Sequence, residues 1–244
     1  MSFVPLPKGT FYIGWDGPGK PGKKTEIKED FEIAVHTVTQ EQWAELMEGE
    51  DKYPSKFRRG GVNAKNVEKI SDEDLKRFPV ENVSWNMAQV YIQKLNEREE
   101  GSGWVYRLPT EAEWEYGCRG GATSEAECSF HFYFDKPTND LSSDQANFDG
   151  NKPFGKAPKG KKLGRPTKLG SYLPNKLGLY DMHGNVCQWC SDPSDPGGSK
   201  RVIRGGCWSG SGSDSRTADR TWGAPAQRDF NLGFRLARVP SGGK

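Results

Sequence analysis

Four residues suited to metal or redox chemistry lie close together in the sequence, namely His183, Cys187, Cys190 and Cys207. Thiolates and imidazoles bind soft metals, so these four could form one metal or redox site. A single C-x-x-C pair is a weak signal, however, because zinc sites combine it with a second pair at a defined spacing. The favoured alternative is a set of small side chains that are buried or line a pocket.

The other cysteines leave a second question open. The chain has five cysteines, so at least one has no partner within it. Cys118 and Cys128 could close a short loop with a disulfide, although spacing alone does not establish the required geometry. The segment Met1–Pro7 has neither a basic nor an apolar signal-peptide region. We therefore expect a cytoplasmic protein with mostly reduced thiols.

Composition narrows the classes of protein that can carry these residues. The 244 residues include 30 Gly and 16 Pro, which argues against a helical bundle, and 8 Trp, 8 Tyr and 12 Phe, which can build a core. No apolar run is long enough to span a membrane. The net charge of +2 gives no reason to expect a nucleic-acid partner. A loop-rich globular domain remains.

Local patterns predict the elements that position the candidate residues. Thr39 with Gln42, and Thr110 with Glu113, form capping boxes that predict helix starts, and Ser84 is the expected cap of a third helix. We expect a strand pair within 3–13, a loop over 14–28 and a strand over 31–38. No linker divides the chain, so residues 1–244 are expected to form one domain. It should carry a surface insert near 49–78 and a polar, solvated loop near 149–168.

Four segments and one upstream tetrapeptide carry a specific resemblance. They are Arg107–Tyr116, Asn175–Val186, Arg201–Gly206 and Leu232–Leu236, preceded by Asn82–Trp85. Together they resemble the formylglycine-generating enzyme (sulfatase-modifying factor) family, over nearly the whole chain and in the expected order. The amino-acid sequences of these segments are most similar to those of single-domain and kinase-linked bacterial members. The resemblance implies a single α+β domain with a C-type-lectin-like fold and little regular secondary structure.

The enzymes of that family oxidise a substrate cysteine with copper held by two cysteines after the Gly-Gly motif. Here the resemblance places Gly210 at the first copper position, and the second has no counterpart. Hydroxyl groups do not replace thiolates as Cu(I) ligands. Copper and the family's catalysis are therefore not expected, so no catalytic residue is assigned. A copper-dependent oxidase acting on a peptide cysteine, or another redox enzyme of the family, remains the alternative.

Calcium is the cofactor that the resemblance favours. One family site maps onto the side chain of Asp181, the backbone carbonyls of Gly184 and Val186, and the side chain of Gln188. Oxygen ligands from a turn suit Ca²⁺, although Gln188 lacks the charge of the family's acidic residue, so the affinity should fall. A second site would begin at Asn147 and Phe148, but its later acidic ligand has no clear match.

The most informative segment for function is Ser209–Ser215, which contains only Ser, Gly and Asp. In the family this segment lines the substrate groove, and the pattern resembles retroelement-diversified variable proteins that use the same fold. We expect a non-catalytic module that binds a protein or peptide, with a surface within 207–231 that diversification could vary. An undiversified binding or regulatory module is an equal alternative. The expected groove residues are Cys187, Cys207, Trp208, Ser209, Ser211, Ser213, Asp214, Trp222 and Arg228.

Overall fold

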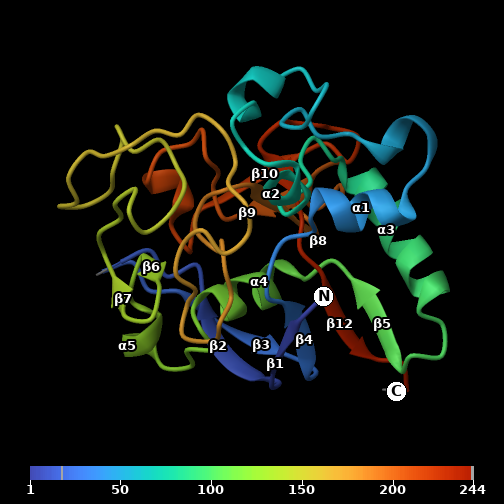
Figure 1. Ribbon diagram of the computed structural model, residues 1–244. Helices are drawn as coiled ribbons and strands as arrows, with labels where there is room; N and C mark the ends of the chain where they lie inside the picture. Colours follow the sequence, from blue (N-terminus) through green and yellow to red (C-terminus); the bar gives the residue numbers. More distant parts are fainter. Residues whose placement is uncertain (18, 243–244) are drawn as a thin grey trace.

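Two four-stranded sheets organise the chain in the computed structural model, which describes residues 1–17 and 19–242 (Figure 1). The first sheet has the antiparallel order β1-β4-β12-β5 and unites both ends of the chain. Its strands are β1 (Phe3–Leu6), β4 (Phe31–Ala34), β12 (Ala237–Pro240) and β5 (Trp104–Arg107). Strands from near both ends of the described chain, β1 and β12, therefore lie in the same sheet.

The second sheet carries two of the four segments that the resemblance singled out, Arg201–Gly206 and Leu232–Leu236. Its order is β10-β9-β8-β11, with β10 at the edge. Its strands are β10 (Arg220–Gly223), β9 (Arg201–Arg204), β8 (Cys187–Pro193) and β11 (Leu232–Gly233). Two small hairpins complete the strands: β2 (Gly9–Ile13) with β3 (Lys23–Ile27), and β6 (Phe132–Tyr133) with β7 (Pro137–Thr138).

The three predicted helix starts are confirmed. Both capping boxes form, at Thr39 before α1 (Gln40–Leu46) and at Thr110 before α4 (Glu111–Cys118). The Ser84 hydroxyl accepts a hydrogen bond from the Met87 amide and caps α3 (Trp85–Arg98). The shorter helices are α2 (Asp72–Lys76), α5 (Glu125–Cys128) and the 3-10 turns η1 (Gly49–Lys52), η2 (Ala64–Val67) and η3 (Ser213–Ser215). Among the described residues, no helix is both long and apolar enough to cross a bilayer.

Two strand predictions near the N-terminus are wrong. The segment 14–28 was expected to be a loop, but β3 lies within it and pairs with β2. Likewise β1 and β2 do not pair with each other, because β1 joins β4 in the first sheet. The side chains of β3 are mostly exposed, so this strand lacks the apolar alternation that predicts a buried one.

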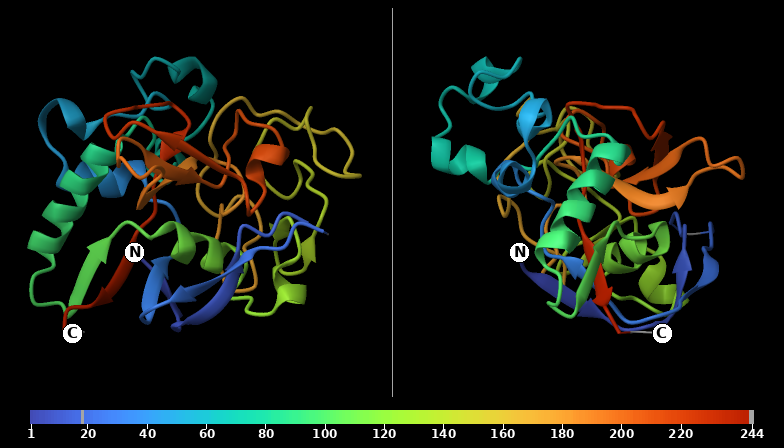
Figure 2. Two further views of the ribbon diagram at one scale, coloured as in Figure 1. Left: turned by 180° about the vertical axis from the view of Figure 1, so that it is seen from behind. Right: turned by 90° about the vertical axis from the view of Figure 1, so that its right-hand side faces the viewer.

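The insert over 49–78 forms a small core of its own above α1. Phe57, Val67, Leu75 and Phe78 are buried there together with Trp208 from the far end of the chain. Figure 2 shows this teal segment standing out from the two sheets. The loop over 149–168 has neither helix nor named strand, as expected, and its Asp149 amide donates to the Gly210 carbonyl (2.8 Å). Both segments therefore support the 207–219 region.

A buried network of charges fixes the end of β9. Glu115 of α4 accepts hydrogen bonds from the guanidiniums of Arg119 (2.7 and 2.9 Å) and Arg204, and all three side chains are almost fully buried. Arg235, also buried, donates to the Gln188 amide oxygen (2.7 Å) and to the Tyr180 carbonyl (2.6 Å). These bonds tie α4, β8 and β9 together just before the Gly205-Gly206 turn.

Candidate functional site

A groove of about 360 Å³ lies where the second sheet meets the loop that follows β9. Gly205 and Gly206 start this loop with positive φ angles of 95° and 69°, which glycine adopts at low cost. At Gly206 a side chain would also collide with Ser215, since its Cβ would lie 2.5 Å from the Ser215 hydroxyl. The lining residues are Cys187, Ile203, Arg204, Gly205, Gly206, Cys207, Gly210, Asp214, Asp219, Arg220 and Thr221.

The structure brings part of the predicted groove set together. Cys187, Cys207 and Asp214 line the groove. Ser209, Ser211 and Ser213 lie on the same loop but do not line it; Ser211 and Ser213 hydrogen-bond to each other (2.6 Å). Trp222 and Arg228 are exposed beyond the groove.

Trp208 contradicts the expectation of a surface aromatic. Its side chain is only 8% exposed, and its ring packs edge-on against Phe57 and at a tilt against Phe230. Gly212, in the same loop, is buried because Phe154 covers it. The insert and the 149–168 loop therefore cover positions that looked exposed in the sequence. Trp222, at 50% exposure, is the aromatic that does face solvent beside the groove.

Two thiols with opposite acidity face the groove. The neighbouring Cys187 thiol, together with the Ser209 hydroxyl and the amides of Ser209 and Gly210, lowers the pKa of Cys207 to about 6, against the opposing effect of burial. The same interaction, assisted by burial, raises the pKa of Cys187 well above its usual value. Cys207 is therefore the thiolate of the pair near neutral pH.

Sequence reasoning missed two charged residues that line the groove, Asp219 and Arg220, and one residue that supports it from outside, Asn231. Burial raises the pKa of Asp219 to about 6, with Arg216 acting in the opposite direction. Arg220 lies on the rim and forms a two-pronged pair with Glu111 (2.8 and 2.9 Å). Asn231 accepts from the Cys187 amide (2.8 Å) and donates to the Ser209 hydroxyl (3.1 Å). These residues lie on or next to β10 and β11, but the sequence does not show that these strands flank β9 and β8 in one sheet.

The four-residue metal site does not form. His183 lies away from the thiol pair: its ring accepts from the Tyr133 amide (2.9 Å) and its other nitrogen contacts the Ser215 carbonyl (2.8 Å). Burial lowers the pKa of His183 to about 4, so its ring is neutral. Cys190 is buried in the apolar core. Across residues 1–17 and 19–242, no group of three or more His, Cys, Asp or Glu side chains could hold a metal ion.

The Cys118–Cys128 disulfide is also absent from the structure, in which all five cysteines are free. The Cys118 sulfur contacts the His183 ring (3.7 Å) and the Thr217 hydroxyl (3.5 Å). The Cys128 thiol donates instead to the Ala122 carbonyl (3.6 Å). Burial raises the pKa of both thiols, which makes them poor nucleophiles.

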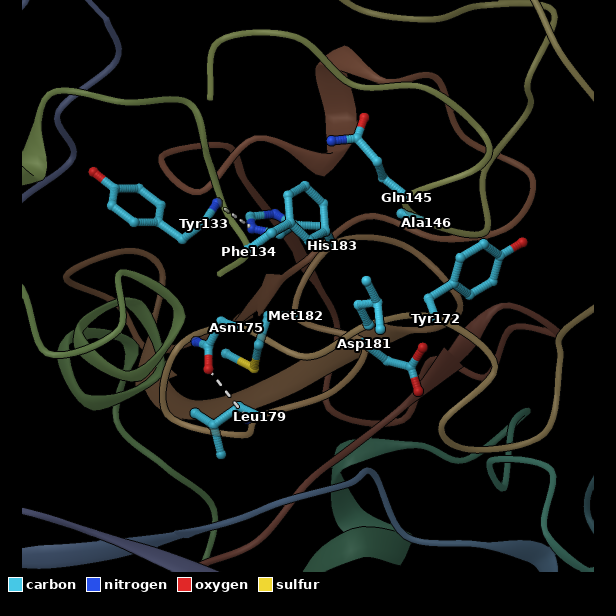
Figure 3. A pocket seen from close by; sticks show the side chains of 11 residues that line it. Tyr133, Phe134, Gln145, Ala146, Tyr172, Asn175, Leu179, Asp181, Met182 and His183 are labelled. Atoms are coloured by element: carbon cyan, nitrogen blue, oxygen red, sulfur yellow. Dashed lines mark hydrogen bonds between the residues drawn. The ribbon is translucent and has the colours of Figure 1, made fainter. Parts of the chain in front are cut away.

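The predicted calcium ligands fit a cation only in part. Asp181 borders a cavity of about 10 Å³, and Figure 3 shows its carboxyl and the His183 ring pointing to different sides. The Asp181 Oδ2 atom is buried without a hydrogen-bond partner, and burial raises the pKa of this carboxyl to about 6. The Gln188 oxygen, in contrast, already accepts from Trp114 (2.8 Å) and from Arg235. The set therefore offers one free side-chain oxygen, beside an arginine cation.

The second predicted calcium site is similar. The Asn147 Oδ1 atom is buried without a partner, while its amide nitrogen donates to the Arg165 carbonyl (3.0 Å) and to Asn185 (3.2 Å). The nearest acidic residue in sequence, Asp149, is held by Lys162 (2.9 Å). Phe148 is buried in a separate aromatic cluster, so only its backbone could serve as a ligand. Calcium at both sites stays a prediction.

Comparisons with known proteins agree with these features of the fold. Residues 1–240 match the family described as "Sulfatase-modifying factor enzyme 1-like domain". "Serine/threonine-protein kinase pkn1" of Chlamydia pneumoniae is 30% identical over 237 residues, which cover 87% of this chain and 33% of the kinase. "Formylglycine-generating enzyme" of Streptomyces coelicolor is 35% identical over 178 residues, covering 65% of this chain and 52% of the enzyme. The chain thus spans about a third of the kinase and half of the enzyme.

A further relative and two solved structures extend over almost the whole chain. "Inactive C-alpha-formylglycine-generating enzyme 2" of Mus musculus is 27% identical, covering 97% of this chain and 85% of that protein. "Treponema denticola variable protein 1" has a TM-score of 0.72 at 24% identity and covers 98% of this chain and 95% of that one. PvdO from Pseudomonas aeruginosa has a TM-score of 0.66 at 24% identity, covering 97% and 93%. The chain belongs to the sulfatase-modifying factor family and has its C-type-lectin-like α+β fold.

Proposed function

We propose that this domain is a non-catalytic module that binds a protein or peptide segment in the groove beside β10. The observation that carries the proposal is the position of the groove at a sheet edge. Among the described strands, β10 pairs with β9 on one side alone, and its residues Arg220, Thr221 and Trp222 are exposed. A free strand edge can pair with an extended peptide, and an exposed Trp supplies apolar contact.

The residue at the expected copper position also supports binding over oxidation. Gly210 lines the groove where the family resemblance places the first copper cysteine. Its amide donates to the Cys207 carbonyl (3.0 Å), and an added Cβ would lie 3.1 Å from the Asp214 carboxyl. A thiol side chain at this position would therefore require the exposed Asp214 carboxyl to move slightly. The rival proposal, a copper-dependent oxidase of a peptide cysteine, lacks this ligand.

A varied binding surface is a refinement of the same proposal. Within 207–231, variation would be tolerated at exposed positions such as Asp214, Trp222 and Arg228, and excluded at the buried Trp208 and Gly212. The test is genomic: a reverse transcriptase and a near-copy of this region beside the coding sequence would establish diversification. Their absence would leave an undiversified binding or regulatory module.

A selection from a displayed library of random peptides tests the binding proposal. We expect selected peptides to bind the wild-type domain and to lose at least about tenfold in affinity to Trp222→Ala, which corresponds to about 1.4 kcal/mol. Tyr53→Ala is the matched control, because Tyr53 is similarly exposed (55%) but lies on the insert away from the groove. Peptides that bind both variants like wild type would place the ligand site elsewhere.

The oxidase alternative is tested separately with a Cys-x-Pro-x-Arg peptide and Cu(I). We expect no conversion of its cysteine, measured as a mass change of the peptide, under conditions in which a formylglycine-generating enzyme converts it. Turnover at a comparable rate would overturn the non-catalytic proposal.

A further inference from the structure

The two groove thiols come from segments that the fold clamps together. Cys187 begins β8, and Cys207 follows β9 by three residues, so the β8–β9 pairing of Gln188 with Arg204 brings them to the same end of the sheet. The Trp208 amide then donates to the Asn185 carbonyl (2.9 Å), which fastens the Cys207 segment onto the approach to β8. Both residues line the groove.

Asn231 and Ser209 form a second clamp around the pair. The Asn231 carbonyl accepts from the Cys187 amide, and its side-chain amide donates to the Ser209 hydroxyl. That hydroxyl lies 3.3 Å from the Cys207 sulfur. A donor held in place beside a sulfur stabilises its thiolate, so the clamp favours a reactive thiol rather than an inert one.

The remaining cysteines lack these features. Cys118, Cys128 and Cys190 are fully buried, and none of them lines the groove. Exchange chemistry needs an accessible thiolate with a second thiol close enough to resolve the product. Cys207 is only 6% exposed and Cys187 is half-buried, but these two are the cysteines of the described residues that line the groove, so a ligand seated there could reach them.

We propose that Cys207 and Cys187 form a thiol–disulfide exchange site, which reduces a disulfide-bearing ligand in the groove. Cys207 is the attacking residue and Cys187 the resolving one. The proposal rests on the proposed function in one respect, because it assumes that the groove is where the ligand binds. It adds the chemical class of that ligand.

The chemistry balances without any further reagent. The Cys207 thiolate attacks one sulfur of the ligand disulfide, the ligand S–S bond breaks, and one ligand thiolate leaves. Cys187 then attacks the Cys207 sulfur of the mixed disulfide, and its proton goes to the second departing sulfur. The Cys187–Cys207 pair is oxidised by two electrons, and the ligand disulfide is reduced to two thiols.

Hydroxyethyl disulfide, a small uncharged probe, tests the exchange directly. After reduction and removal of the reductant, wild type should close a Cys187–Cys207 disulfide, identified by intact mass and peptide mapping. Cys187→Ser should accumulate the mixed disulfide at Cys207, because the resolving thiol is absent. In wild type, which keeps the Cys187 thiol, loss of the free Cys207 thiol should be about tenfold faster at pH 7 than at pH 5, following the thiolate fraction of Cys207.

Matched variants separate this site from general thiol reactivity. Cys207→Ser should lose the reaction at Cys187, whereas Cys128→Ser should react like wild type. Asn231→Ala should slow adduct formation at Cys207 while the fold, checked by circular dichroism, is retained. No adduct at Cys207 in folded Cys187→Ser and Cys187→Ala, or adducts spread over the buried cysteines, would overturn the proposal.

Peptide binding distinguishes failure of the exchange from failure of the groove. The affinity of the library-selected peptides is measured for wild type and for the double variant Cys187→Ser, Cys207→Ser, which cannot exchange thiols. If exchange is absent but wild type binds peptides in a Trp222-dependent manner, only the exchange proposal is wrong. If neither occurs, the groove is not the ligand site.

Discussion

The buried charge network and the groove meet at the end of β9, where Arg204 is followed three residues later by Cys207. Polar groups are enclosed and paired in the network, but in the groove they face an open space. In the network, the Glu115 carboxylate is shared between Arg119 and Arg204, and the three side chains are almost completely enclosed. Three residues after Arg204, Cys207 lines an open groove with Asp219, and the pKa of each lies at about 6. The network is enclosed and its charges are paired, whereas the groove is open and holds two groups whose pKa lies near neutral pH.

This contrast indicates that the buried network has a structural role, whereas the groove is available for binding. A buried ion pair contributes little net stability, because desolvation offsets much of the attraction, but breaking one is costly. Such a network therefore holds α4 and β9 in one arrangement. Arg204 belongs to both regions, but Cys207 and Asp219 form no such fully buried ion pair, so we expect them to be replaceable without loss of the framework.

Removing the shared carboxylate should have the largest effect. Glu115→Gln keeps the shape but leaves two buried guanidiniums without a counter-charge, so we expect a loss of about 3–5 kcal/mol in the free energy of unfolding, measured by urea denaturation. Glu111→Gln is the comparison at the rim: Glu111 pairs with the exposed Arg220 and lies 3.7 Å from Arg204 at the edge of the network, so its loss should be smaller, about 1 kcal/mol. Equal losses in the two variants would remove the distinction between network and rim.

Glu81 sharpens the comparison, because it is a buried framework carboxyl that is only half paired. Its Oε1 accepts from the Phe57 amide (2.9 Å), its Oε2 has no partner, and burial raises its pKa to about 8 from 4.5. A carboxyl with a raised folded-state pKa stabilises fully below pH 4.5, and this contribution is lost as the pH rises through 8. Gln mimics the protonated form.

Glu81→Gln should therefore be more stable than wild type by about 4 kcal/mol at pH 8 and nearly equal to it at pH 4.5. The measurement is the midpoint of urea unfolding across that pH range. A constant difference at all pH values would mean that Glu81 is already ionised in the folded protein.

The two kinds of cysteine should respond in opposite ways to the same substitution. Cys190→Ser places a hydroxyl in the apolar core and should cost about 1–3 kcal/mol, while leaving thiol labelling of the folded protein unchanged. Cys207→Ser should cost less than about 1 kcal/mol and abolish that labelling. Unfolding curves and labelling by a disulfide reagent check the two readouts, and a reversed pattern would place the reactive thiol in the core.

The framework could be predicted largely from sequence, because its signals are local or motif-based. The capping boxes at Thr39 and Thr110 depend on residues three positions apart, and both form. The family motifs then identify the fold without the need to derive strand order. Strand β3 was missed because its residues are mostly polar and because it pairs only with β2, in a separate two-stranded sheet.

The groove was predictable only in outline, because long-range packing decides which of its residues are exposed. Nothing near Trp208 in the sequence indicates that Phe57, about 150 positions earlier, covers its ring. The Cys187–Cys207 contact likewise depends on the β8–β9 pairing, whereas the C-x-x-C spacing pointed to Cys190, whose side chain lies in the core. Alternation along β8 explains why residues three apart need not share a site.

Calcium should produce the smallest effect, and it tests whether the Asp181 cavity belongs to the framework or to the ligand-binding parts of the molecule. With one free carboxylate oxygen and Gln188 engaged by Trp114 and Arg235, we propose a weak site of millimolar affinity. Free calcium at about ten times the Kd should then raise the free energy of unfolding by about 1.4 kcal/mol, which corresponds to a few degrees in Tm. Asp181→Asn should abolish this increase, and magnesium should not reproduce it. An equal Tm with calcium and with chelator would mean that the Arg235 cation alone balances Asp181, and that the cavity is purely structural.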